Sequence, residues 1–283
     1  MSDKKSRAKK DALLQQWLKR KPQKAKVPSI SPRPEGSLAP LSYGQERLWL
    51  LQQLYPDNAF YHYAHRYRFT GSFDAERFGR AVELLSERHQ VLRSTFSEVD
   101  GQIRQVPRSE ASPERSHFDL REYDAAEQAH QIAQQREAWS RRPFDLANGP
   151  LLRVATFRTA PEQHEVLLVI HHIIGDRWSL RVLQEELARY YENPEAPLEA
   201  LPIQYGDYAH WQRQQTQNQS HLDYWRRQLA GELPVLQLPA ERSRPAHPSL
   251  RGGMMSQTFD APLSQQIRQL RQQHQTTLYA VLL

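Results

Sequence analysis

Cysteine is absent from this 283-residue sequence, which excludes disulfide bonds, thiolate nucleophiles and zinc–thiolate sites together. Long apolar runs are absent too: no stretch approaches the roughly 18 consecutive apolar residues of a membrane helix. The N-terminus carries charged residues but no apolar segment of the kind found in secretory signals. We therefore expect a cytoplasmic protein that has no membrane as a partner.

Positive charge is concentrated at one end of the chain. Residues 1–26 hold ten lysines and arginines against two aspartates, a net charge of +8, so the other residues carry −2 of the overall +6. A basic tail can bind nucleic acid or an acidic protein surface, or can simply be solvated. Because no aromatic–basic platform or base-reading motif accompanies the tail, the sequence argues against nucleic acid as its partner.

The same end of the chain contains a basic amphipathic helix, predicted over residues 1–21. Its leucines and Trp17 form a one-sided apolar stripe, and Pro22 ends it. Five prolines between residues 22 and 40 predict an extended linker. A short helix of this kind is marginal alone, so residues 1–26 are a candidate docking element; packing back onto its own domain is the alternative.

Helical and strand-like patterns interleave through the rest of the chain, which predicts a mixed α/β fold, an α+β two-layer sandwich. Helices are expected over residues 41–54 with Ser42 as N-cap, 74–89, 125–141, 177–191, 205–215, 221–229 and 263–274. Strands are expected over residues 61–70, 92–99, 102–106, 151–157, 165–170 and 254–259. The last nine residues open a further apolar helix that stops without a cap, so we expect a fragment.

The most informative segment is HHIIGDRWS, residues 171–179. It follows an apolar run that is typical of a buried strand and precedes a helical pattern. Because neighbouring side chains of a strand point to opposite faces, His171 and His172 are predicted to have different tasks, one as a base in a cleft and one in the scaffold. A metal site is disfavoured, since the two rings diverge and no third well-spaced ligand lies nearby.

Five segments resemble, in order, the motifs of one family. They are SYGQERLWLLQQL at 42–54, RHQVLRSTF at 88–96, PFDLANGPLLR at 143–153, HHIIGDRWS at 171–179 and YGDYAHW at 205–211. Over roughly residues 38–283 the chain is similar to the condensation domain of nonribosomal peptide synthetases, a member of the chloramphenicol-acetyltransferase-like superfamily. The resemblance implies an N-terminal lobe over 41–232. A connector and the incomplete start of a similar C-terminal lobe, truncated by the end of the chain, would occupy 233–283.

The resemblance also implies an activity: peptide (amide) bond formation between an acyl or aminoacyl donor and an aminoacyl acceptor, both held as thioesters on carrier proteins. No cofactor is tightly bound; 4′-phosphopantetheine arrives on the donor and acceptor peptidyl carrier proteins. The implied partners include adjacent adenylation and carrier modules or a polyketide synthase. Two alternatives stay open, another HHxxxD acyltransferase with a coenzyme A or carrier-protein donor, and a non-catalytic interaction module.

The family's motifs imply roles for individual residues. His172 matches the catalytic histidine, acting either as a base or by positioning the amine and stabilising the oxyanion, and His171 matches a scaffold histidine. Asp176 is expected to form a buried ion pair with Arg88 or Arg93 rather than to orient the base. Gly175, Trp178 and Ser179 complete the site motif.

Three other residues stand out in the comparison with the motifs. Arg177 occupies the position of the family's glycine, which would alter the backbone of the turn or place a cation beside the cleft. Arg47 and Trp211 are candidate cleft-lining residues, with structural roles as the alternative.

Overall fold

The computed structural model describes residues 29–109, 112–195, 198–215, 219–236 and 255–283. The chain divides into two compact units, Met1–Val235 and Leu236–Leu283. The predicted helix over 1–21, the linker up to residue 28 and most of the Pro-rich connector lie outside the described residues. Within the described ranges, no helix is long and apolar enough to cross a membrane.

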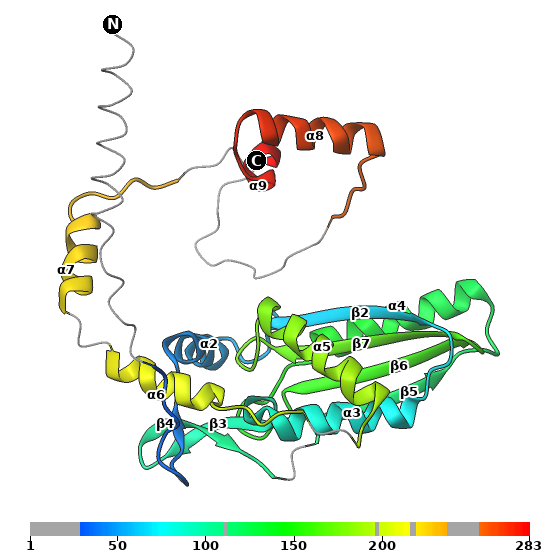
Figure 1. Cartoon of the computed structure of the whole chain (residues 1–283), viewed down its shortest axis with the longest axis horizontal. Helices are drawn as coiled ribbons and strands as arrows, with labels where there is room; N and C mark the ends of the chain where they lie inside the picture. The colour runs from blue at the N-terminus through cyan, green and yellow to red at the C-terminus, as the bar shows by residue number, and fades with distance from the viewer. Residues whose placement is uncertain (1–28, 110–111, 196–197, 216–218, 237–254) are drawn as a thin grey trace, which may run out of the picture. The chain divides into compact units, whose positions relative to one another are not determined.

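The first unit contains two sheets and a set of helices, several of which pack on the sheets (Figure 1). Its strands are β1 (Ala39–Pro40), β2 (His62–Thr70), β3 (Ser94–Val99), β4 (Gln102–Pro107), β5 (Glu114–Asp119), β6 (Leu152–Ala160) and β7 (Gln163–His171). Its helices are α2 (Tyr43–Leu54), α3 (Ala75–Arg88), the 3-10 helix η1 (Gln90–Arg93), α4 (Ala125–Arg141), α5 (Arg177–Glu192), α6 (Tyr205–Gln215) and α7 (Gln219–Gln228). The second unit contains α8 (Ala261–Gln273) and α9 (Leu278–Leu282).

The larger sheet has the strand order β2-β7-β6-β5, and the smaller has the order β1-β4-β3. All pairs are antiparallel except β5–β6, which is parallel. Helices cover both faces of the larger sheet: Arg153 on β6 bonds a carbonyl oxygen of α4, whereas its neighbour Val154 lies beside Phe78 of α3. Since adjacent strand residues point to opposite faces, α4 and α3 lie on opposite sides. The predicted mixed α/β class is confirmed.

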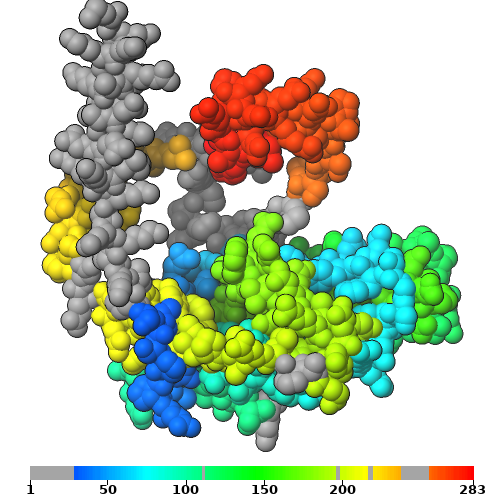
Figure 2. Space-filling model, in the orientation of Figure 1, coloured from blue at the N-terminus to red at the C-terminus, as the bar shows by residue number. Residues whose placement is uncertain are grey.

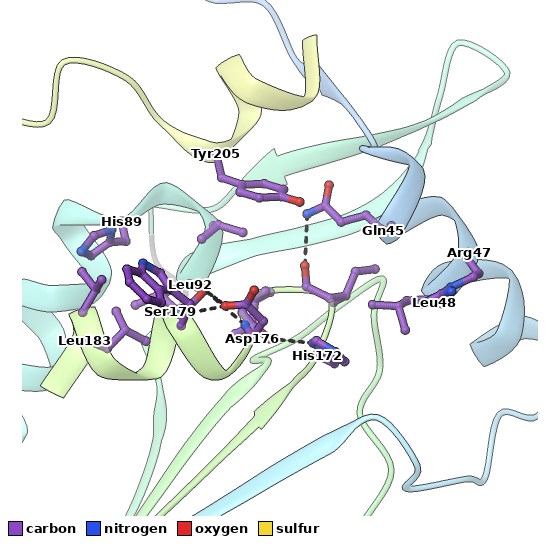
Figure 3. A pocket seen from close by; sticks show the side chains of 17 residues that line it. Gln45, Arg47, Leu48, His89, Leu92, His172, Asp176, Ser179, Leu183 and Tyr205 are labelled. Atoms are coloured by element: carbon purple, nitrogen blue, oxygen red, sulfur yellow. Dashed lines mark hydrogen bonds between the residues drawn. The ribbon is translucent and has the colours of Figure 1, made fainter. Parts of the chain in front are cut away.

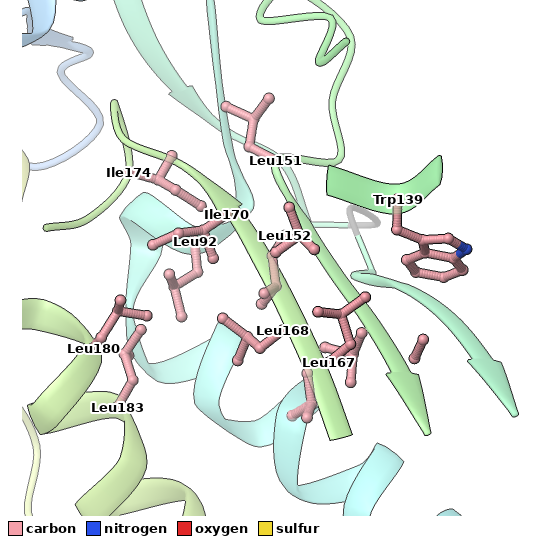
Figure 4. Packing of buried hydrophobic residues seen from close by; sticks show 14 of the residues in the cluster. Leu92, Trp139, Leu151, Leu152, Leu167, Leu168, Ile170, Ile174, Leu180 and Leu183 are labelled. Carbon is pink, nitrogen blue, oxygen red and sulfur yellow. The ribbon is translucent and has the colours of Figure 1, made fainter. Parts of the chain in front are cut away.

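Burial on both faces explains why the two central strands are continuous apolar runs. Eight of the nine residues of β7 are buried, and the apolar ones among them belong to one cluster with apolar residues of α3, α4 and α5 (Figure 4). Leu180 and Leu183 of α5 and Trp139 of α4 belong to the same cluster of buried side chains. The strand that ends at His171 is therefore held by buried contacts up to its last residue.

Most predicted elements are present, and several boundaries agree closely. Helices α4 and α6 have the predicted bounds, and Ser42 caps α2 in a capping box with Gln45. Two strands, β1 and β5, were not predicted. Two predictions were wrong: residues 92–93 belong to η1, and residues 255–259 form no strand. A strand requires a partner, and no strand in the described part of the chain pairs with 255–259.

The Pro-rich segment is not a free tether along its whole length. Arg33 donates from its backbone N–H and its guanidinium to Asp207 of α6, at 3.1 and 2.7 Å, and Pro40 pairs with Arg104 of β4. Figure 2 shows this blue segment lying beside the yellow residues of α6. Arg33 and Pro40, which lie within the segment predicted as a linker, thus contact α6 and β4.

Candidate functional site

His171 is the last residue of β7, and His172 opens the loop between β7 and α5. The polar backbone groups of this loop are paired with specific partners. The N–H of Ile173 donates to Nδ1 of His171 at 3.1 Å, and its carbonyl oxygen accepts from Nε2 of Gln45 at 3.1 Å. The N–H of Ile174 donates to the carbonyl oxygen of His171. These bonds fix the backbone that presents His172.

The two histidines lie in different environments, as the strand periodicity predicted. His171 is completely buried, whereas His172 is half-buried and lines a pocket. Burial, together with the nearby His62 and His172, lowers the pKa of His171 to about 3, so this ring is neutral near physiological pH. His171 is thus unsuited to proton transfer with a substrate.

His172 is held by a hydrogen bond that defines its tautomer. Its Nδ1 lies 2.9 Å from the carbonyl oxygen of Gly175. A carbonyl oxygen can only accept, so Nδ1 carries the proton and Nε2 of the neutral ring carries a lone pair. Among the described residues, Nε2 has no hydrogen-bond partner, and Tyr63 packs against the ring edge-on at 4.7 Å. The imidazole therefore presents a basic nitrogen that is free to accept a proton.

Asp176 forms no ion pair with any residue that the structure describes, so the predicted pair with Arg88 or Arg93 is wrong. Its Oδ1 accepts from the N–H of Ser179 at 2.8 Å and from the Ser179 hydroxyl at 2.7 Å, which makes Asp176 the N-cap of α5. These hydrogen bonds from Ser179, followed by the charge of His172, hold the pKa of Asp176 below its usual value. The carboxylate thus anchors the loop through the helix terminus.

The two arginines have other partners. Arg88 donates to Glu186 of α5 at 3.1 Å and to the Glu199 carbonyl oxygen at 2.6 Å, and Glu186 also accepts from His89 at 2.5 Å. Arg93 donates to the carbonyl oxygen of Arg108. Glu186 lies outside the five motifs, so no motif identified it as the acceptor. Arg88 therefore links α3 to α5 and does not bind the loop that carries His172.

A pocket of about 360 Å³ opens beside the loop (Figure 3). His172, Gly175, Asp176, Trp178 and Ser179 of the predicted site line it. Its remaining walls come from α2, from η1 and the residue before it, from the loop and α5, and from Tyr205 at the start of α6; these residues are Gly44, Gln45, Arg47, Leu48, His89, Val91, Leu92, Ile173, Ile174, Val182, Leu183 and Tyr205. The pocket is therefore mainly apolar, with the imidazole and a carboxylate at one wall.

Of the two residues predicted to line the cleft, Arg47 lies at the pocket and Trp211 does not. Arg47 of α2 lines the pocket, is exposed to solvent and has no ion-pair partner among the described residues. Trp211 does not line this pocket; it packs against Tyr208 with ring centres 5.9 Å apart. Trp178, by contrast, is 71% exposed at the pocket wall rather than packed in a core.

Arg177 is compatible with the turn that it occupies. It is the first residue of α5, and the only non-glycine residues with positive φ in the described ranges are Asp100 and Gln275. The substitution of the family's glycine therefore causes no backbone strain. Its guanidinium does place a cation close to His65 on β2, where burial and then this charge lower the histidine pKa.

Gln45 is a site residue that sequence reasoning missed. It is 2% exposed; its Oε1 accepts from the N–H of Ser42, and its Nε2 donates to Ile173 and, at 3.3 Å, to Gln105 of β4. Ser42 in turn bonds the Tyr205 hydroxyl at the pocket wall. The signals in the sequence were its place in the first of the five motifs and its position three residues after a serine N-cap. No group of three or more potential metal ligands occurs among the described residues.

Comparisons with known proteins agree with this architecture. The family model described as Condensation domain matches residues 36–283. A linear gramicidin synthase subunit from Brevibacillus parabrevis is 38% identical over 261 residues, covering 90% of this chain and 3% of that protein. Surfactin synthase subunit 1 of Bacillus subtilis (strain 168) is 35% identical over 264 residues, covering 92% and 7%. The chain thus spans a small part of these relatives.

Solved structures show the same fold. The starter condensation domain of rhizomide synthetase matches with a TM-score of 0.61 and 26% identity, over 69% of this chain and 48% of that one. The X-domain from teicoplanin biosynthesis matches with a TM-score of 0.73 and 23% identity, over 88% and 56%. The chain belongs to the condensation domain family, and the resemblance identified from the motifs is confirmed.

Proposed function

We propose that this chain catalyses peptide-bond formation between a donor acyl or aminoacyl thioester and an acceptor aminoacyl thioester, both carried by peptidyl carrier proteins. The observation that carries the proposal is the free Nε2 of His172 in a pocket wall, with Nδ1 occupied by the carbonyl oxygen of Gly175. Membership of the condensation domain family supports the same reaction class.

The reaction requires a proton acceptor beside the attacking amine. The α-amine nitrogen attacks the donor carbonyl carbon, the N–C bond forms, and the C–S bond breaks to release the thiol of the donor arm. In this step Nε2 of His172 takes the proton from the amine and returns it to the departing sulfur. Because Nδ1–H is committed to Gly175, the neutral ring offers only an acceptor at Nε2, which favours proton transfer over oxyanion stabilisation.

His171 and Asp176 act as supports in this proposal. Nδ1 of His171 holds the N–H of Ile173, directly after His172, and Asp176 fixes the other end of the loop on α5. Neither has to exchange a proton during the reaction. The apolar walls formed by Leu48, Leu92 and Leu183 would exclude water from the thioester and so limit its hydrolysis.

The partners follow from the substrates. Donor and acceptor carrier proteins would bring the thioesters on 4′-phosphopantetheine arms. Adjacent adenylation and carrier modules, or a polyketide synthase, would supply these loaded carrier proteins. Residues 1–26, with a net charge of +8, would dock on an acidic surface of an upstream protein. Removing residues 1–26 is expected to weaken transfer from that upstream carrier, while a donor offered in excess is still used.

The test is a condensation assay with donor and acceptor thioesters on their carrier proteins, using the full-length protein and its His172→Ala variant. Amide product from the unchanged protein alone supports the proposal. Turnover with coenzyme A thioesters but not with carrier-bound donors would instead indicate another HHxxxD acyltransferase. Absence of product with both donors, from a folded protein, would indicate a non-catalytic module.

A further inference from the structure

Two buried histidine nitrogens near the site have no hydrogen-bond partner among the described residues: Nε2 of His171 and Nε2 of His62. His62 lies directly opposite His171 in the β2–β7 pairing, and the two rings are 5.8 Å apart, edge to face. A buried polar atom without a partner is unfavourable, so each of these two nitrogens requires an explanation.

The other nitrogen of each ring establishes which of the two unpaired nitrogens is a donor. Nδ1 of His171 accepts from the N–H of Ile173, so the proton of this neutral ring is on Nε2. Nδ1 of His62 lies 2.7 Å from the carbonyl oxygen of Ser140 and must donate to it, so Nε2 of His62 carries a lone pair. The two unpaired atoms are therefore one donor and one acceptor, on facing rings.

We propose that His62 is a positioning residue for the active-site loop: its Nε2 accepts the hydrogen bond from Nε2–H of His171, directly or through one enclosed water molecule. This bond stabilises the tautomer that leaves Nδ1 of His171 free to hold Ile173. In the opposite tautomer, Nδ1 would carry a proton, the N–H of Ile173 would lose its acceptor, and the backbone after His172 would be released.

The surroundings keep this pair neutral and enclosed. Phe144 packs edge-on against both rings, with ring centres 4.8 Å from His62 and 6.0 Å from His171. The guanidinium of Arg153 lies over the ring of Phe144, at 3.7 Å from its centre. Burial, and then the charge of Arg153, lower the pKa of His62, although its bond to Ser140 acts in the opposite direction. The PFDL segment thus contributes the wall that shields the two histidines.

The primary experiment reads the tautomers by ¹⁵N NMR of histidine-labelled full-length chain. We expect His171 to be protonated at Nε2 and His62 at Nδ1. A through-bond coupling between the two Nε2 nuclei would show a direct bond, whereas its absence together with a water in a crystal structure would show the bridged form. Protonation of His171 at Nδ1 would overturn the proposal, whatever the protein's activity.

Two matched variants separate the functions of the two His62 nitrogens. His62→Gln keeps an acceptor near the position of Nε2, whereas His62→Asn keeps the donor to Ser140 and loses the acceptor. We expect His62→Asn to shift the His171 tautomer and to lower kcat about tenfold with little change in KM, and His62→Gln to preserve both. Equal behaviour of the two variants would contradict the assignment.

The kcat measurements on the His62 variants rest on the proposed function, whereas the NMR measurement of the tautomers does not. A protein with the expected tautomers but no condensation activity would therefore contradict only the proposed reaction. A protein that condenses thioesters normally with His171 protonated at Nδ1 would contradict only the role of His62. If neither variant folds, the tautomers of the unchanged protein still decide the question.

Discussion

Nδ1 of His172 donates a 2.9 Å hydrogen bond to the carbonyl oxygen of Gly175, three residues further along the same loop. This bond orients the ring and decides which nitrogen faces the pocket. Gly175 suits this position because a β-carbon there would come within 3.2 Å of the Ile170 side chain. The bond closes the loop that presents the imidazole of His172 to the pocket.

Replacing His172 with alanine should lower kcat by about 10²- to 10⁴-fold, the usual contribution of a positioned proton acceptor. Stability should change little, since the ring is only half-buried. Carrier-dependent amide formation and thermal unfolding measure the two effects. His130→Ala, at an exposed histidine on α4, is the matched control and should retain full activity. A His172→Ala protein as active as this control would refute the assignment.

Asp176→Ala should destabilise the chain by about 1 kcal/mol, as expected for the loss of a helix N-cap. A buried ion pair broken on one side would cost about 3–5 kcal/mol instead. Urea unfolding distinguishes these values. The control is Asp176→Asn, which preserves the acceptor for the N–H of Ser179 and should be close to the unchanged chain in stability. A large loss in both variants would indicate that the negative charge itself is required.

Gln45→Ala should cost about 1–3 kcal/mol, because it leaves the buried carbonyl oxygen of Ile173 and the N–H of Ser42 without partners. Turnover should fall as well, since the backbone after His172 loses one of its restraints. Urea unfolding and the condensation assay report the two effects. Gln53→Ala, on an exposed position of the same helix, provides the comparison. Unchanged turnover despite lower stability would limit Gln45 to a structural role.

Stability should decrease as the pH falls below about 6.5, because burial lowers the pKa of several histidines, His171 and His62 among them. Burial lowers the pKa of His171 to about 3 and also lowers that of His62, so the unfolded chain binds protons that the folded chain does not. Each such histidine contributes a slope of up to about 1.4 kcal/mol per pH unit below its unfolded pKa. The loss therefore begins at the unfolded value and continues toward the folded one.

Urea unfolding between about pH 6.5 and 5.5 measures this slope before carboxylates of ordinary pKa begin to titrate appreciably. His171→Gln removes one titrating group, and the slope of this variant should be smaller than that of the unchanged chain. His130→Gln, at an exposed position, should leave the slope unchanged. An equal slope in the unchanged chain and the His171→Gln variant would mean that His171 is not held neutral.

Local signals in the sequence were sufficient to predict the positions of most helices. Ser42 and Gln45 form the capping box of α2, and apolar periodicity located α4 and α6 at their observed bounds. Such features depend on residues three or four positions apart, which the sequence displays directly. The divergence of His171 and His172 followed from strand periodicity for the same reason.

The pairing of strands and the pairing of charged side chains were harder to predict from the sequence. β5 is visible as a strand only through its parallel pairing with β6, about 40 residues further on, and β1 only through β4. The partner of Arg88 is Glu186, almost a hundred residues away, rather than the aspartate of the site motif. The sequence offers several acidic residues as possible partners for each arginine, and only the packed structure shows which one lies beside it.

The sequence by itself determined the family, the order of most helices and strands, and the opposite orientation of the two histidines, because motifs and periodicity are local properties. The tertiary structure decided which nitrogen of His172 is free, that Asp176 caps a helix, and that Gln45 holds the Ile173 carbonyl oxygen across 128 positions of the chain. These outcomes depend on which donor meets which acceptor after folding. A hydrogen bond forms only within about 3 Å, and only the packed chain sets such distances between remote residues.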